Sequence, residues 1–100
     1  MQRLTRTTTR ALLAFLDAPG SWRYGYDLMK AAGLSSGTLY PLLARLTDDG
    51  WLESRWEESE FPGRPPRQLY RLTATGRLQA REALSRAQAS WFGPPRPSEN

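Results

Sequence analysis

The stretch from Ser35 to Gly50 constrains the fold most, because one apolar stripe runs through it at helical spacing. Spaced at i, i+3, i+4 and i+7, the residues of this stripe are Leu39, Leu42, Leu43 and Leu46. This is the spacing of one buried helix face, and Gly50 just past the last leucine is a helix-stop signal. Ser35 or Ser36 can cap the start, because a short hydroxyl accepts a hydrogen bond from a free backbone N–H. The pattern predicts a short amphipathic helix with a small polar front end.

Two shorter helical patterns precede this helix. The first is predicted at residues 8–18, with a threonine among residues 7–9 as its cap. Its expected apolar side consists of Leu12, Leu13, Phe15 and Leu16. The second is predicted at residues 24–32 and ends at Gly33. Its expected inward residues are Leu28, Met29 and Ala32. Two helices joined by a short link, the first ending at glycine, are the helix-turn-helix signature.

Two segments of alternating polarity follow, separated by a proline-rich loop. In residues 51–57, the face expected to be half-buried holds Leu52, Ser54 and Trp56. In residues 67–72, the matching face holds Gln68, Tyr70 and Leu72. Residues 58–66 contain three prolines and a glycine, which neither a strand nor a helix tolerates. The segments predict a β-hairpin with a long tip, and loops of that size are often functional.

A last helical pattern starts after Thr73, which can cap it, and runs from residue 74 to about residue 91. Apolar residues recur along it at spacings of 4, 3 and 4, which is typical of a seam between packed helices. The seam consists of Ala80, Leu84, Ala87 and Trp91.

The order helix, helix, helix, strand, loop, strand, helix buries its apolar faces as a three-helix core with a hairpin on one edge. We therefore predict an α+β, mainly α fold: a winged helix-turn-helix with a two-stranded wing and a C-terminal helix. The winged helix is predicted to span residues 1–72 and the C-terminal helix residues 73–92. Residues 93–100 are expected to be disordered from their composition.

In a winged helix, the third helix enters the DNA major groove and the wing tip reaches a flanking phosphate or the minor groove. Free backbone N–H groups at the front of the third helix favour a phosphate. The small hydroxyl donors at this end are Ser35, Ser36 and Thr38. Tyr40 can donate its hydroxyl to a phosphate, and Arg45 can bind one by charge. In the wing loop, Arg64 and Arg67 flank a pair of prolines. The prolines would stiffen the loop and hold both guanidinium groups outward.

Each candidate contact also has a purely structural explanation. The serines can act as caps alone, and the ring of Tyr40 can pack on the edge of the core. Arg45 can be solvated or pair with Asp48 or Asp49, and the wing arginines can be ordinary surface charge. The six acids within residues 48–60 oppose tight contact between the base of the wing and DNA.

The amino-acid composition limits which catalytic and metal sites the chain can form. A length of 100 residues corresponds to one small domain. The absence of cysteine and histidine excludes disulfides, the usual zinc sites, cysteine nucleophiles and histidine general bases. No apolar run approaches the roughly 20 residues of a membrane span, and no signal-peptide pattern opens the chain. We expect a cytoplasmic protein that is not an enzyme and holds no cofactor or metal.

Positive charge is grouped along the chain. Residues 1–10 and 61–81 contain arginines and no acid, and Lys30 is the only lysine. The planar fork of arginine suits phosphate oxygens and guanine edges, although a GC-rich genome also favours arginine codons. Such blocks predict a polarised surface rather than a uniform one.

Several of these motifs together resemble the PadR family of transcriptional regulators. They are Tyr24-Gly25-Tyr26, Gly37-Thr38-Leu39-Tyr40-Pro41, Gly50-Trp51-Leu52, Arg64-Pro65-Pro66-Arg67 and Tyr70-Arg71-Leu72-Thr73. The resemblance covers roughly residues 8–85 and fits the short type with a single C-terminal helix. The compact link between the second and third helices departs from the family pattern, in which several more residues are common.

The resemblance implies a repressor that binds a palindromic operator in double-stranded DNA as a homodimer. It implies that Tyr40 and the front of the third helix touch DNA, followed by the wing arginines. It also implies that the C-terminal helix forms the dimer, a role that the seam from Ala80 to Trp91 fits on its own. A small-molecule effector is a further hypothesis, with a dimer-interface pocket lined by Trp91, Phe15 or Trp22. The alternative function is a winged helix that binds only protein.

Overall fold

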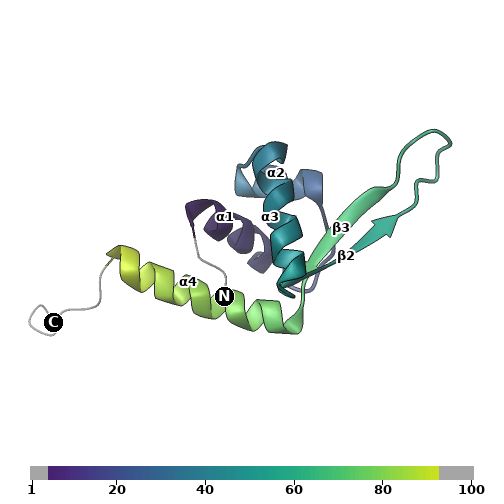
Figure 1. Ribbon diagram of the computed structural model, residues 1–100. Helices are drawn as coiled ribbons and strands as arrows, with labels where there is room; N and C mark the ends of the chain where they lie inside the picture. The colour runs from purple at the N-terminus through teal and green to yellow at the C-terminus, as the bar shows by residue number, and fades with distance from the viewer. Residues whose placement is uncertain (1–4, 93–100) are drawn as a thin grey trace, which may run out of the picture.

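The computed structural model describes residues 5–92, with the side chains of residues 5–86. Within this range the helices are α1 (Arg6–Leu16), α2 (Gly25–Ala32), α3 (Ser36–Asp48) and α4 (Ala74–Phe92), and the strands are β1 (Arg23–Tyr24), β2 (Leu52–Glu57) and β3 (Arg67–Leu72). Figure 1 shows α1, α2 and α3 grouped above α4, with the β2–β3 hairpin projecting from this helical body as a wing. This arrangement confirms the expected mainly helical winged helix.

The sheet has three strands, one more than the predicted two-stranded wing. The strand order is β1-β3-β2, and both pairings are antiparallel. β1 pairs Tyr24 with Leu69, and the far end of the hairpin pairs Glu57 with Arg67. A strand of two residues is too short to show an alternating pattern, which explains why the sequence did not predict it.

The leucines of α3 form the centre of the core, as predicted. Leu39, Leu43 and Leu46 are 0% exposed, and Leu42 is 1% exposed. Buried residues from the other helices and from both hairpin strands pack in the same cluster, including Leu12, Phe15, Leu28, Leu52, Leu72 and Ala80. One continuous apolar cluster therefore fixes the orientation of α3 relative to the wing and to α4.

The predicted start and apolar side of α1 need correction. The cap is not among residues 7–9 but is Thr5, whose Oγ1 accepts a hydrogen bond from the N–H of Thr8 at 3.1 Å. Leu13, predicted to face inward, is 54% exposed. The buried face instead includes Thr8, Thr9, Ala11, Leu12, Ala14 and Phe15. With Thr8 and Thr9 on that face, the helical period turns Leu13 outward.

The predicted burial of the hairpin holds only at its base. Leu52 is buried, but Ser54 is exposed and Trp56 is 64% exposed, so the half-buried face of residues 51–57 was wrong beyond Leu52. The physical reason is visible in Figure 1, where the hairpin leaves the helical body soon after it begins. On β3 the prediction is confirmed for Tyr70 and Leu72, which are both buried.

α4 begins as predicted, because Thr73 Oγ1 accepts a hydrogen bond from the N–H of Gly76 at 2.8 Å. Gly76 lies directly against the backbone of Trp51, so α4 starts in close contact with the base of the wing. From there α4 runs beneath the other helices (Figure 1). None of the helices in the described part of the chain is long and apolar enough to cross a membrane.

Candidate nucleic-acid interface

The front of α3 is a small polar surface that is open to solvent. Ser35, Ser36 and Thr38 are exposed, whereas the leucines of the same helix are buried. Ser35 occupies the N-cap position, but its side chain makes no capping bond. Of the two possible caps, Ser35 and Ser36, Ser35 takes the cap position, but its Oγ donates to Thr38 Oγ1 at 3.2 Å instead of accepting from a backbone N–H. The front of α3 therefore carries hydroxyl groups without a side-chain cap at Ser35.

Tyr40 lies on the flank of α3 and packs its ring against Gly25 at the start of α2. A Cβ on Gly25 would lie 2.8 Å from Cζ and 2.9 Å from Cε1 of this ring, and would also overlap the hydroxyl oxygen. Tyr40 nevertheless remains 41% exposed. Packing and DNA contact, which the sequence left as alternatives for Tyr40, are therefore compatible with each other.

Arg45 does not lie with the other candidates on α3. It is exposed and belongs to the last turn of the helix. With a rise of about 1.5 Å per residue, it lies roughly 13 Å along the helix axis from Ser36. The structure thus brings Ser35, Ser36, Thr38 and Tyr40 to one end of α3 and leaves Arg45 at the other.

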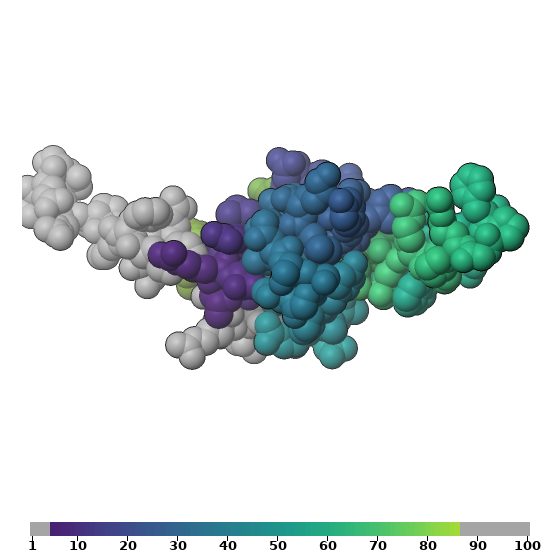
Figure 2. Space-filling model, turned by 90° about the horizontal axis from the view of Figure 1, so that it is seen from above, coloured from purple at the N-terminus to yellow at the C-terminus, as the bar shows by residue number. Residues whose placement is uncertain are grey.

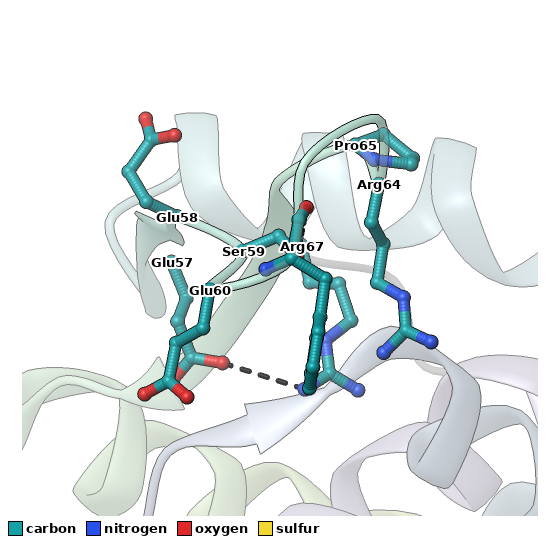
Figure 3. A pocket seen from close by; sticks show the side chains of 8 residues that line it. Glu57, Glu58, Ser59, Glu60, Arg64, Pro65 and Arg67 are labelled. Carbon is teal, nitrogen blue, oxygen red and sulfur yellow. Dashed lines mark hydrogen bonds and ion pairs between the residues drawn. The ribbon is translucent and has the colours of Figure 1, made fainter.

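The tip of the wing carries charges of both signs around a pocket of about 370 Å³. Figure 3 shows the acids Glu57, Glu58 and Glu60 on one side and Arg64 on the other, with Arg67 between them. The guanidinium of Arg64 lies 5.0 Å from the centre of the Phe61 ring. Both residues of this cation–π pair are exposed, so the charge of Arg64 is available at the wing tip.

Arg67 does not point outward as predicted. Its guanidinium lies 4.1 Å from the centre of the Tyr24 ring and 3.5 Å from Glu57 Oε1. The Tyr24 hydroxyl donates to the same oxygen at 2.6 Å, and this hydrogen bond raises the pKa of Tyr24. The prediction was wrong because Tyr24, on the unforeseen strand β1, gives Arg67 a ring to stack on. Its side chain is still 61% exposed, so a phosphate can compete for it.

The side chains that cover the outer face of the sheet were not predicted from the sequence. The ring of Trp22 lies 4.5 Å from the Arg55 guanidinium and 4.3 Å from that of Arg71. Arg71 in turn pairs with Glu53 at 3.0 Å. The ring of Trp22 therefore packs against the base of the wing, which argues against its hypothesised role in an effector pocket. Glu53 and Arg55 alternate with Leu52, Ser54 and Trp56 and so share the opposite face of β2, but this alternation does not indicate what covers that face.

The predicted dimer seam on α4 is only partly open to a partner. Ala80 is 0% exposed within the chain's own core, so its predicted contact with a second copy is wrong for this conformation. Leu84 is half-buried against the same core. The side chains of Ala87 and Trp91 lie outside the described residues. Phe15, hypothesised to line an effector pocket, is 2% exposed and belongs to the core instead.

Comparisons with known proteins agree with this architecture. The model of the Transcriptional regulator PadR-like family matches residues 12–82. A PadR-like transcription factor from Bacteroides fragilis is 34% identical, with 87% of this chain and 82% of that chain covered, at a TM-score of 0.62. A PadR family transcriptional regulator from Eggerthella lenta is 32% identical, with 88% and 80% covered, at a TM-score of 0.71.

A more distant structure shares the fold. The PcaV transcriptional regulator from Streptomyces coelicolor, solved in complex with its natural ligand, is 22% identical at a TM-score of 0.65, with 98% of this chain and 67% of that chain covered. Among curated proteins, none matches the sequence significantly. The family match includes the helix-turn-helix, the wing and the first part of α4. The chain therefore belongs to the PadR-like family, whose members are transcriptional regulators and not enzymes.

Proposed function

We propose that this regulator is a cytoplasmic repressor that binds a palindromic DNA operator as a homodimer. The observation that carries the proposal is the exposed front of α3 beside an arginine-tipped wing. Figure 1 shows the N-terminal end of α3 and the wing tip directed toward the same side of the molecule, with α4 on the opposite side. A DNA duplex lying along that side would meet both elements at once.

Within the α3 front, Ser35, Ser36, Thr38 and Tyr40 are the proposed contacts. Their hydroxyl groups suit phosphate oxygens and base edges, because each can donate or accept a hydrogen bond. Arg64 is the proposed wing contact, and Arg67 joins it if a phosphate replaces Glu57 as its partner. The position of Arg45 at the far end of α3 suits a phosphate further along the duplex.

The homodimer is proposed to form through α4 and the exposed side of α1. Leu13 on α1 is 54% exposed and Leu78 on α4 is 70% exposed, so each of these helices carries an apolar side chain that a partner can cover. Figure 1 also shows the C-terminal part of α4 extending past α1. A symmetric dimer through this side would present two α3 helices about 34 Å apart, the repeat of one DNA turn.

We extend the proposal to a small-molecule effector of unknown identity, by analogy with PcaV, which was solved with its natural ligand. Titration of aromatic compounds against the tryptophan fluorescence of the dimer tests this extension. A spectrum unchanged across a broad panel of compounds argues against an effector.

Gel-shift measurements on the DNA directly upstream of the protein's own gene test the main proposal. They are made at two salt concentrations with unrelated duplex DNA as competitor. Specific retention that weakens steeply with salt is expected, because phosphate contacts release counterions. Retention that unrelated DNA removes equally well contradicts an operator-specific regulator. No retention at low salt favours a winged helix that binds only protein.

A further inference from the structure

A second surface feature lies between the two elements proposed to contact DNA. A groove of about 480 Å³ is bounded by the start of α2, the flank of α3 and the inner side of the wing. Its aromatic lining comes from all three elements and consists of Tyr24, Tyr26, Tyr40 and Trp56. In Figure 2, which looks down on this side, α3 occupies the centre and the wing extends to the right, with residues of α2 between them.

Three of the aromatic side chains that line the groove remain largely exposed to solvent. Trp56 and Tyr26 are each 64% exposed, and Tyr40 is 41% exposed. Trp56 belongs to the same face of β2 as the buried Leu52, so its indole is directed to the α3 side of the wing. Clustered exposed rings of this kind mark a surface that a partner covers.

The lining has little net charge and several neutral donors. Arg67 and Asp27 both line the groove, and Lys30 lies 5.4 Å from the centre of the Tyr26 ring. Tyr26, Tyr40 and Trp56 each combine an apolar face with one hydroxyl or indole N–H donor. This combination matches a sugar–phosphate backbone, in which apolar deoxyribose carbons alternate with phosphate oxygens.

We propose that the groove holds the backbone of one DNA strand as it passes from the major groove at α3 to the wing. The proposal rests on the proposed function and adds two contact residues to it, Trp56 and Tyr26. The groove is continuous with Tyr40 at one end and with Arg67 at the wing, so a strand that reaches both must cross it. Because the indole and phenol groups are neutral, they hold the strand without displacing counterions.

Trp56→Ala tests the proposal by its effect on both affinity and salt dependence. The variant is expected to bind operator and unrelated duplex DNA about tenfold more weakly, because the groove touches backbone and not bases. Plots of log affinity against log salt concentration for the variant and the wild type should be parallel, since no phosphate-bound charge is lost. Arg64→Ala, in contrast, should lower the slope by about one unit.

Phe61→Ala is the matched control, since Phe61 is a similarly exposed wing aromatic outside the groove, and its removal leaves the charge of its neighbour Arg64 in place. It is expected to keep its affinity within twofold, and both aromatic variants should melt at the wild-type temperature. Trp56→Phe should retain part of the affinity, because the phenyl ring keeps an apolar face and lacks the indole N–H donor.

If the wild-type protein binds DNA and Trp56→Ala binds the same DNA equally tightly, the groove assignment is overturned and the proposed function stays intact. A loss of affinity confined to the operator also overturns it, because backbone contact is independent of sequence. If the wild-type protein binds no duplex DNA at low salt, both the groove assignment and the proposed function fail.

Discussion

Gly25 and Gly76 fix two contacts on which the candidate interface depends. At Gly25 the neighbour is the partly exposed ring of Tyr40, which has room to move. At Gly76 the neighbour is the backbone of Trp51, and an added Cβ would lie 2.7 Å from its carbonyl carbon and 2.8 Å from its Cα. The two sites therefore differ in how an added methyl group can be accommodated.

Gly76→Ala is expected to lower the free energy of unfolding by about 2 kcal/mol or more, because α4 or the base of the wing must shift to make room. Gly37→Ala is the control, since a Cβ there meets no atom within 4 Å. In the control, alanine's better helix propensity should leave the stability unchanged or raise it by up to about 1 kcal/mol. Urea unfolding of both variants measures the difference, and equal stabilities would contradict the close contact at Gly76.

Two tyrosines make stability depend on pH on the alkaline side. Burial, with a smaller contribution from Tyr40, raises the pKa of Tyr70 above 10.0, and the hydrogen bond to Glu57 raises the pKa of Tyr24. A raised folded-state pKa contributes stability that is complete below the unfolded value of 10.0 and is lost as pH rises from there through the higher folded-state value. Urea unfolding across this range should show the decline, and Tyr70→Phe should make it shallower. An unchanged decline in that variant would assign it to other groups.

At the scale of elements, β1 acts as a brace for the base of the wing. Its neighbour Trp22 lies against Arg55 and Arg71, and its own Tyr24 lies against Arg67. These contacts join the segment between α1 and α2 to both strands of the hairpin. Aromatic–arginine contacts therefore support the base of the wing in addition to the apolar core on which it rests.

Trp22→Ala is expected to lower the free energy of unfolding by about 1–3 kcal/mol, from two cation–π contacts of roughly 0.5–1 kcal/mol each and the lost apolar contact. Hydrogen exchange of the β2 and β3 amides should accelerate. Phe61→Ala removes a single exposed cation–π contact at the wing tip and should change stability by less than about 1 kcal/mol. If both variants are equally stable, β1 is not the brace.

Helices and strands in which apolar residues recur at a regular spacing were predicted from the sequence. Contacts between side chains of different elements were not. The predicted burial of the α3 leucines was correct for every residue, because a single side of this helix packs against a single core. The alternation in residues 51–57 gave the correct face for Trp56 but not its depth, since a wing can extend beyond the core that its base covers. The position of Arg67 was wrong because its partner Tyr24 lies on another strand, and local spacing carries no information on such a pairing.

For the candidate site, the front of α3 was predictable because Ser35, Ser36 and Thr38 follow from the helix boundary and its buried stripe. The aromatic groove was not predictable. It forms where three separate elements meet, and Tyr26, Tyr40 and Trp56 are far apart in the chain. The PadR-like combination of motifs contains Tyr26 and Tyr40 but not Trp56.

At the scale of the whole molecule, α4 lies opposite the surface proposed to bind DNA (Figure 1). A dimer formed on that side leaves both α3 helices free to reach one duplex. Ala80 is buried in the chain's own core, so we propose that the partner contact comes from residues further along α4 and from the exposed side of α1.

Trp91→Ala is expected to shift the protein from dimer to monomer, because Trp91 ends the predicted seam and a buried tryptophan contributes strongly to an interface. Phe61→Ala is the control, since Phe61 is an exposed aromatic residue at the wing tip, away from both α4 and α1. Sedimentation over a range of concentrations distinguishes the two variants. A dimer that persists unchanged in Trp91→Ala would refute the role of this residue.

A hydroxyl-radical footprint of the protein on its own upstream DNA tests the central claim most directly. We expect two protected patches on one face of the duplex, centred about 10 base pairs apart, corresponding to two α3 helices in successive major grooves. We also expect Tyr40→Phe to weaken both patches equally, by on the order of 1 kcal/mol. A single patch would contradict the homodimer, and protection that unrelated DNA abolishes equally well would contradict a specific operator.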